Sequence, residues 1–102
     1  MIEAINRIEK YSARGRDIFE SDELIQTYIL HHLQVIGEAA FKMPQDFRER
    51  YPEVPWPKML GMRHILVHGY FEIDLDIVWA VVQKDLPELK RKLEAILRRI
   101  GD

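Results

Sequence analysis

An arginine, two histidines and a tyrosine fall within eight residues of this 102-residue chain, as Arg63, His64, His68 and Tyr70. Histidine titrates near neutral pH, so His68 could serve as a general base or acid. Arginine keeps its charge, and its planar guanidinium matches the oxygens of a phosphate. A tyrosine hydroxyl can position a phosphate or donate a proton. Together these groups suit metal-free cleavage of an RNA strand, which needs a base for the 2′-hydroxyl, an acid for the leaving 5′-oxygen and a cation for the phosphorus centre.

The spacing of these residues constrains how they can meet. On an ideal α-helix, residues five apart are rotated by roughly 140°, so Arg63 and His68 would point to different sides. They converge only if the helix ends near Val67 and Gly69 lets His68 turn back, or if two chains share the site. We expect both, with Gly69 ending the helix in a left-handed conformation. The C-terminal end of a helix also favours a positive imidazolium, which suits His68 as an acid facing phosphate.

The elements that must carry these groups are helices, because apolar residues recur at three- and four-residue steps and no segment alternates as a strand would. Residues 44–57 hold four of the five prolines and should form a connection with a short helical turn at 45–50. Two helices are expected before this connection, namely a short one that ends near Gly15 and one of about 20 residues that is capped by Ser21 or Asp22 and ends before Pro44. Three helices are expected after it. The first runs from Pro57 to Gly69, the second is capped by Asp74, and the last runs from Leu86 to Ile100.

Composition narrows the class of protein. The chain is 47% hydrophobic and 31% charged, which is typical of one globular domain over residues 1–102. It has no cysteine, which excludes a disulfide framework, a thiolate metal site and a cysteine nucleophile. No apolar run approaches the roughly 18 residues that span a bilayer, and no secretory signal is evident, so we expect no membrane association and a cytoplasmic location. The net charge of −2 argues against a nucleic-acid coat protein but not against local contact with RNA.

The pattern Arg-x-x-x-x-His-x-Tyr, formed by Arg63, His68 and Tyr70, resembles the signature of the HepT branch of the HEPN ribonucleases. The chain departs from the family's pattern at His64, where relatives usually have Asn or Asp, and its first helix is one or two turns shorter than in many relatives. Further segments resemble the family in the same order along the chain, namely Ile-Gly-Glu-Ala-Ala at 36–40, Tyr-Pro-Glu-Val-Pro-Trp at 51–56, Val-Trp at 78–79 and Asp-Leu-Pro-Glu-Leu at 85–89.

The resemblance implies an all-α, up-and-down HEPN-like bundle of four to five helices that is homodimeric, with its active site at the dimer interface. It implies a toxin that cleaves RNA without a metal or other cofactor, with Arg63 holding the scissile phosphate and His68 transferring protons. It also implies a partner, an MntA-like nucleotidyltransferase antitoxin that transfers AMP from ATP to Tyr70. The added phosphates would fill the basic site with negative charge and block RNA.

Two further residues are candidates for the site. Glu38 could pair with a motif cation, and His64 could orient a neighbour in the right tautomer. His64 and His68 lie one helical turn apart, but two ligands are too few for a zinc site, so we expect no metal.

Plainer interpretations stay open at this stage. Arg63 could form a surface ion pair with Glu72 or Asp74, His68 could be a polar helix cap, and Tyr70 could be a half-buried aromatic residue. The chain could then be a non-catalytic nucleotide- or RNA-binding partner of a nucleotidyltransferase, which the departure at His64 favours, or a structural helical dimer.

Overall fold

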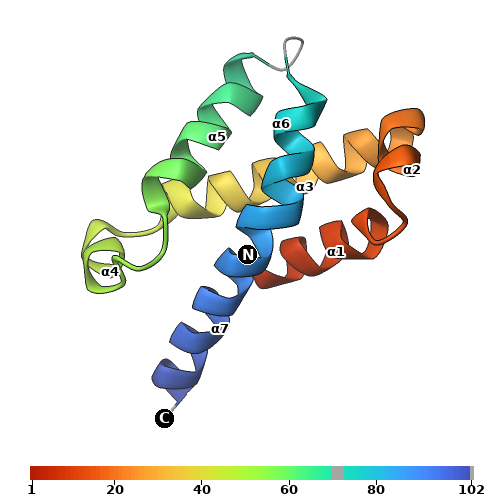
Figure 1. Ribbon diagram of the computed structural model, residues 1–102. Coiled ribbons are helices and arrows are strands. Elements are labelled where there is room, and N and C mark those ends of the chain that lie inside the picture. Colours follow the sequence, from red (N-terminus) through yellow and green to blue (C-terminus); the bar gives the residue numbers. More distant parts are fainter. Residues whose placement is uncertain (70–72, 102) are drawn as a thin grey trace.

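The computed structural model describes residues 1–69 and 73–101, and it contains helices and no strand within those ranges. This confirms the predicted all-α fold. The elements in chain order are α1 (Ile2–Ser12), α2 (Arg16–Ser21), α3 (Glu23–Lys42), α4 (Gln45–Arg50), α5 (Trp56–His68), α6 (Leu75–Ala80), the π-helical segment η2 (Val81–Asp85) and α7 (Leu86–Gly101) (Figure 1).

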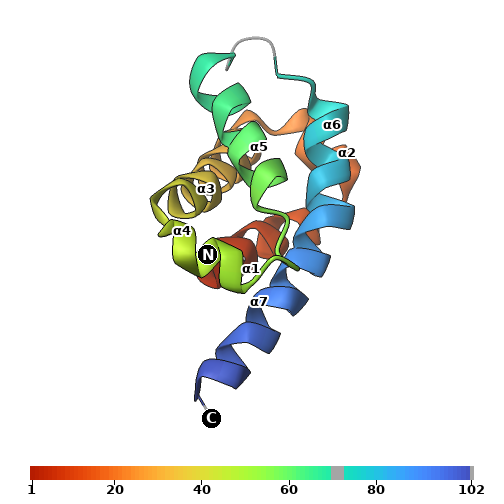
Figure 2. The same cartoon turned by 90° about the vertical axis from the view of Figure 1, so that its left-hand side faces the viewer.

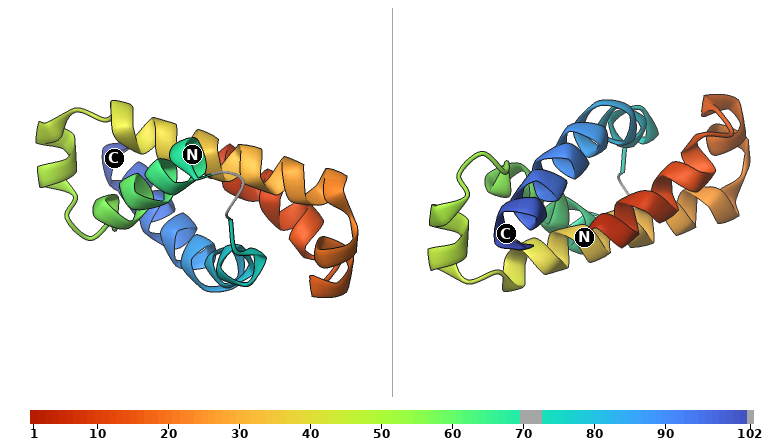
Figure 3. Two further views of the ribbon diagram at one scale, coloured as in Figure 1. Left: turned by 90° about the horizontal axis from the view of Figure 1, so that it is seen from above. Right: turned by 90° about the horizontal axis from the view of Figure 1, so that it is seen from below.

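The long helix α3 is the centre of the fold and packs against α1 on one side and α5 on another (Figure 3). It begins where expected, because a side-chain oxygen of Asp22 accepts hydrogen bonds from the backbone N–H groups of Leu24 and Ile25, at 2.9 and 3.3 Å. It ends at Lys42, and the extended backbone of Met43 precedes Pro44 as a proline requires. The predicted bounds of this helix are therefore confirmed.

The proline-rich connection sets the start of α5. The indole N–H of Trp56 donates a hydrogen bond to the Tyr51 carbonyl, at 3.0 Å, and Val54 is almost fully buried. Pro57 lies in the first turn of α5, where its missing N–H leaves no hydrogen bond unmade. The short helix α4 forms at the predicted residues.

Two details of the predicted helices are wrong. Gly69 does not adopt the left-handed conformation, since its φ is −127°, and its N–H donates to the Ile65 carbonyl at 2.7 Å. Helical geometry therefore continues through His68. The sequence reading also missed α2, a six-residue helix that follows a turn at Gly15, whose φ of 101° suits glycine. Only Phe19 of α2 is buried, so the helix carries no periodic apolar signal.

Helices α6 and α7, with η2 between them, form one continuous rod along the side of the molecule (Figure 2). Two separate helices were expected here, and the structure joins α6 to α7 through η2. Pro87 lacks an N–H, and its ring would crowd the carbonyl of Gln83 in a regular α-helix. The wider π-helical turn just before it lets the rod continue, as such turns do where the regular ladder is interrupted.

The core lies between these helices, and its most deeply buried members come from α1, α2, α3 and the connection before α5. One polar side chain of α3 is also buried, since His32 is 7% exposed while its neighbour His31 is exposed. No helix within the described residues is both long enough and apolar enough to cross a membrane. The largest fully buried side chains are Ile5, Ile8, Phe19, Ile29, Leu33, Ile36 and Val54.

Candidate functional site

Arg63 lies on the side of α5 that faces α3. Its Nε atom is 3.3 Å from a carboxylate oxygen of Glu38, and its guanidinium carbon is 4.0 Å from the centroid of the Phe41 ring. The Nε atom is buried and has no hydrogen bond of good geometry, so the Glu38 contact is an ion pair without a well-aligned hydrogen bond. An arginine over an aromatic face keeps its charge and gains a favourable cation–π contact. The guanidinium is thus positioned by α3.

The approach of α5 to α3 depends on Gly37. A Cβ atom at this position would lie 2.6 Å from the Cβ of Arg63, which is closer than real Cβ atoms come, and 3.2 Å from its Cα, which is a tight contact. The missing side chain therefore allows the two helices to touch at the position of Arg63. Glu38 is the next residue after Gly37, and Phe41 lies one helical turn after Gly37. One short segment of α3 therefore makes all of these contacts with Arg63.

His64 and His68 lie on an exposed part of α5. Their ring centroids are 4.6 Å apart with an interplanar angle of 51°, so His64 contacts His68 one helical turn away. Because α5 stays helical through His68, the expected return of His68 towards Arg63 within one chain is wrong.

The other candidate residues are placed as follows. The structure brings Glu38 to Arg63. The alternative ion pair of Arg63 with Asp74 is not formed, because the Asp74 side chain caps α6 and accepts a hydrogen bond from the Asp76 N–H at 2.8 Å. Tyr70 and Glu72 lie outside the described residues. Phe41 was not singled out from the sequence, although its place one turn after Gly37 is the signal that could have found it.

Apolar side chains surround the motif on the outer surface. Ile65 and Val67 of α5 are 58% and 41% exposed, and Phe41 of α3 is 57% exposed. The buried side of α5 is apolar as well, with Met59 and Leu66 in the core. A helix that is apolar on both sides usually has a partner on each. The outer surface of α5 therefore has the character of a contact surface for another chain.

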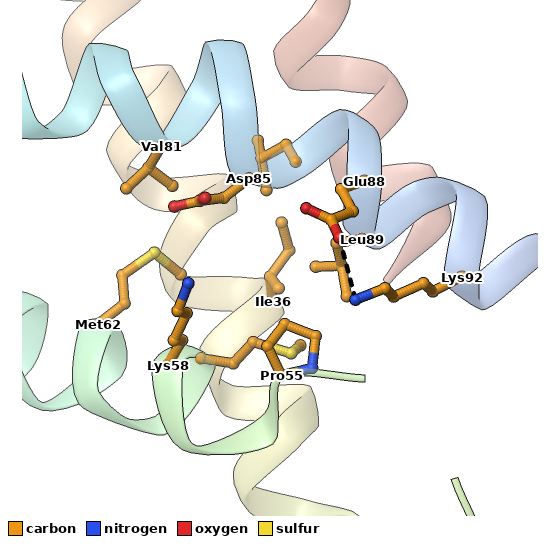
Figure 4. Close-up of a pocket in the computed structure, with 11 residues that line it drawn as sticks. Ile36, Pro55, Lys58, Met62, Val81, Asp85, Glu88, Leu89 and Lys92 are labelled. Carbon is orange, nitrogen blue, oxygen red and sulfur yellow. Dashed lines mark ion pairs between the residues drawn. The ribbon is translucent and has the colours of Figure 1, made fainter. Parts of the chain in front are cut away.

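A cavity of about 130 Å³ lies between α5 and the rod formed by η2 and α7 (Figure 4). Its apolar lining includes Ile36, Met59 and Leu89, and charged side chains stand at its edge. Among these, Lys92 lies 3.1 Å from Glu88, and this hydrogen-bonded pair lowers the pKa of the Glu88 carboxyl. None of the motif residues described lines the cavity, so the candidate site is the α5 surface. In the described part of the chain, no three metal-ligating side chains come together.

Comparison with known proteins decides the family. The family model described as "Ribonuclease HepT-like" matches residues 1–96. The chain belongs to this family. The HepT-like assignment agrees with the helical fold and with the order of segments noted in the sequence. No solved structure matched the chain.

The relatives of this HepT-like chain include proteins named for ribonuclease activity. The "Probable ribonuclease HepT" of Thermococcus cleftensis is 39% identical over 98 residues, which cover 92% of this chain and 86% of the relative. A "Putative RNase" of Caldanaerobacter subterraneus is 34% identical over 92 residues, covering 90% and 82%. The "Gamma-glutamylcyclotransferase and putative RNase" of Methanocaldococcus jannaschii is 36% identical over 101 residues, covering 98% and 46%, so this chain spans about half of that relative.

The close crossing of α3 and α5 can be tested by replacing each of two glycines with alanine. Gly37→Ala should destabilise the protein by roughly 1–3 kcal/mol, since the added methyl would overlap the Arg63 backbone and side chain. Gly61→Ala meets nothing within 4 Å on the exposed side of α5 and should stabilise it by up to about 1 kcal/mol. Urea denaturation followed by circular dichroism measures both. Equal effects from the two substitutions would show that the close crossing is not what Gly37 provides.

Proposed function

We propose that this HepT-like chain is the toxin of a toxin–antitoxin pair and acts as a metal-independent endoribonuclease. The observation that carries the proposal is the placement of Arg63 and His68 on one helix, at a surface edged by exposed apolar side chains, in a chain whose relatives are named ribonucleases. Arg63 binds the scissile phosphate, and His68 transfers protons.

Arg63 suits the phosphate-binding role because its guanidinium is already oriented. Phe41 supports its face and Glu38 contacts its Nε, so RNA does not have to order a free side chain. Among the described residues Arg63 forms an ion pair only with Glu38, which leaves part of its guanidinium for the oxygens of a phosphate. Stabilising the extra charge on the five-coordinate phosphorus is where such a preorganised cation contributes most.

His68 suits proton transfer because it is an imidazole exposed in the last turn of α5, where a substrate can reach it. In the proposed reaction a base removes the proton of the 2′-hydroxyl, and the 2′-oxygen attacks phosphorus. The bond to the 5′-oxygen breaks, and an acid supplies that oxygen with a proton. The products are a 2′,3′-cyclic phosphate and a free 5′-hydroxyl. His68 supplies one of these two proton transfers.

A homodimer formed through the outer surface of α5 would complete this site. A second copy would cover Ile65 and Val67, and symmetry would bring the same surface of its own α5 into contact. Arg63 of one chain could then lie near His68 of the other, which one helix alone does not allow. The active unit in this proposal is the dimer.

The catalytic claim is tested by incubating the purified protein with single-stranded RNA in excess EDTA. Cleavage should persist without divalent metal, and His68→Ala should slow it by about 10²–10⁴-fold, the usual contribution of a general acid or base. Lys84→Ala, an exposed substitution on η2, serves as the control and should cleave normally. Loss of cleavage in EDTA, or full activity of His68→Ala, would refute the mechanism.

The shared site is tested by mixing two inactive variants. Co-expressed Arg63→Ala and His68→Ala chains should recover up to about a quarter of wild-type activity, because half of random dimers are mixed and each holds one intact pair. Each variant alone is the control. If mixing restores nothing while the mixed dimers form, Arg63 and His68 act within one chain.

The control of activity is proposed to lie at Tyr70, two residues after His68 in the sequence. An MntA-like nucleotidyltransferase would bind the toxin and direct the tyrosine hydroxyl to the α-phosphorus of ATP, forming an O–P bond and releasing pyrophosphate. Co-expression with such a partner should add the mass of one or more AMP groups to the peptide that carries Tyr70, and Tyr70→Phe should abolish the addition. An inactive complex with an unmodified Tyr70 would mean inhibition by contact alone.

The alternative is a non-catalytic nucleotide- or RNA-binding partner of a nucleotidyltransferase. The observation that favours it is the contact of His64 with His68 at a position where the family usually has Asn or Asp. Binding of RNA without cleavage by the wild-type protein would support this alternative over the ribonuclease.

A further inference from the structure

A row of aromatic rings crosses from α1 to α3 on the surface of the protein. The rings of Tyr11 and Tyr28 meet edge to face with centroids 4.8 Å apart, and Tyr28 lies 4.4 Å from His32. His32 in turn lies 5.1 Å from the exposed ring of His31. Four rings thus follow one another from the end of α1 to the middle of α3.

Positive charge accompanies this row. The ammonium of Lys10 and the guanidinium of Arg14 lie 5.7 and 5.1 Å from the centroid of the Tyr11 ring. Arg7, one turn earlier on α1, pairs with Glu3 at 2.7 Å in an exposed ion pair. Alternating rings and cations are the combination that proteins use to bind single-stranded nucleic acid, because bases stack on rings while cations bind phosphates.

The row continues to the candidate active site. One shallow hollow is lined by residues that include Arg7, His31 and Val35, and a second is lined by His31, Val35 and Glu38 among others. The two hollows share His31 and Val35 and therefore form one surface. Glu38 at its far end contacts Arg63. Along α3, Tyr28 and Glu38 are ten residues apart, which corresponds to roughly 15 Å.

The net charge of this surface is opposite in sign to the net charge of the whole chain. It carries five cations and two carboxylates, which gives +3, whereas the whole chain has a net charge of −2. Both carboxylates already contact one of the cations. Such local excess of positive charge is the electrostatic mark of a nucleic-acid contact. The five cations are Arg7, Lys10, Arg14, Lys42 and Arg63, and the two carboxylates are Glu3 and Glu38.

His32 adds an unpaired polar atom to the floor of the first hollow. The side chain is 7% exposed, and its Nδ1 has no hydrogen-bond partner in the described structure. Burial, with help from nearby His31 and Arg7, lowers the pKa of this imidazole, so the ring is neutral at neutral pH. Unpaired buried nitrogens are uncommon in folded proteins, and this one belongs to a residue that lines the first hollow.

We propose that this surface is an RNA track that binds single-stranded RNA across α1 and α3 and leads it to Arg63. The track is defined by Tyr11, Tyr28, His31 and His32 with Arg7, Lys10 and Arg14. It rests on the proposed ribonuclease function and adds to it the form of the substrate. A duplex hides the faces of its bases, so only unpaired bases can stack on the accessible rings of Tyr11, Tyr28 and His31, while the buried His32 supports this row from below the surface.

The test measures binding apart from cleavage. In a His68→Ala background, which leaves RNA intact, a fluorescently labelled single-stranded oligonucleotide is titrated and its anisotropy recorded at several salt concentrations. Lys10→Gln with Arg14→Gln should weaken binding about tenfold or more and reduce the salt dependence, because two phosphate contacts are lost. Arg91→Gln with Arg98→Gln removes the same charge from the exposed face of α7 and should change affinity by less than about twofold.

The rings are tested in the same background. Tyr28→Leu should weaken binding about tenfold, the usual effect of losing one stacked base, while Tyr28→Phe should bind like the parent. Duplex RNA of the same sequence should compete poorly. The Lys10 and Arg14 variants change exposed residues only, so they decide the question even if Tyr28→Leu fails to fold.

The outcomes separate this proposal from the ribonuclease activity. If both charge-removing pairs weaken binding equally, if neither does, or if duplex binds as well as single strand, the track is refuted while cleavage by the wild type can still stand. If the wild type cleaves nothing but the track variants lose binding as described, the track is supported and the ribonuclease proposal fails.

Discussion

The contact between Gly37 of α3 and Arg63 of α5 is the constraint on which the rest of the site depends. It lets two helices touch where most helix pairs keep a layer of side chains between them. The same contact brings Glu38 and Phe41 to the guanidinium, so packing and electrostatics are set by one crossing. The arginine is consequently oriented by the fold itself.

The position of this crossing depends on the capped start of α3 and on the buried connection before α5. Asp22 fixes where α3 begins, and Trp56 with its hydrogen bond to Tyr51 fixes where α5 begins. A helix whose first residue is fixed presents a defined face at every later position. The position of Arg63 against α3 therefore depends on segments far from it in the sequence.

Much of this could be predicted from the sequence, because local signals are strong there. Asp22, Pro44, Pro57 and Asp74 mark helix ends through hydrogen bonds and steric effects that act within a few residues. The conformation of Gly69 was not predictable in this way, because a glycine allows many conformations and its surroundings select one. The contact of Arg63 with Phe41 depends on how two helices cross, which no local pattern specifies.

The π-helical turn in the C-terminal rod has a consequence for how the family's chains can vary in length. It places the apolar residues of α6 and α7 on one side of a single rod, with Val78, Leu89 and Ile96 all buried. A π-helical turn holds one residue more than a regular α-helical turn, so removing one residue between Ala80 and Pro87 would return the turn to regular α-helix. Leu89 and Ile96 would keep their place in the core, so this stretch can lose one residue where a regular helix would rotate everything after the deletion by roughly 100°.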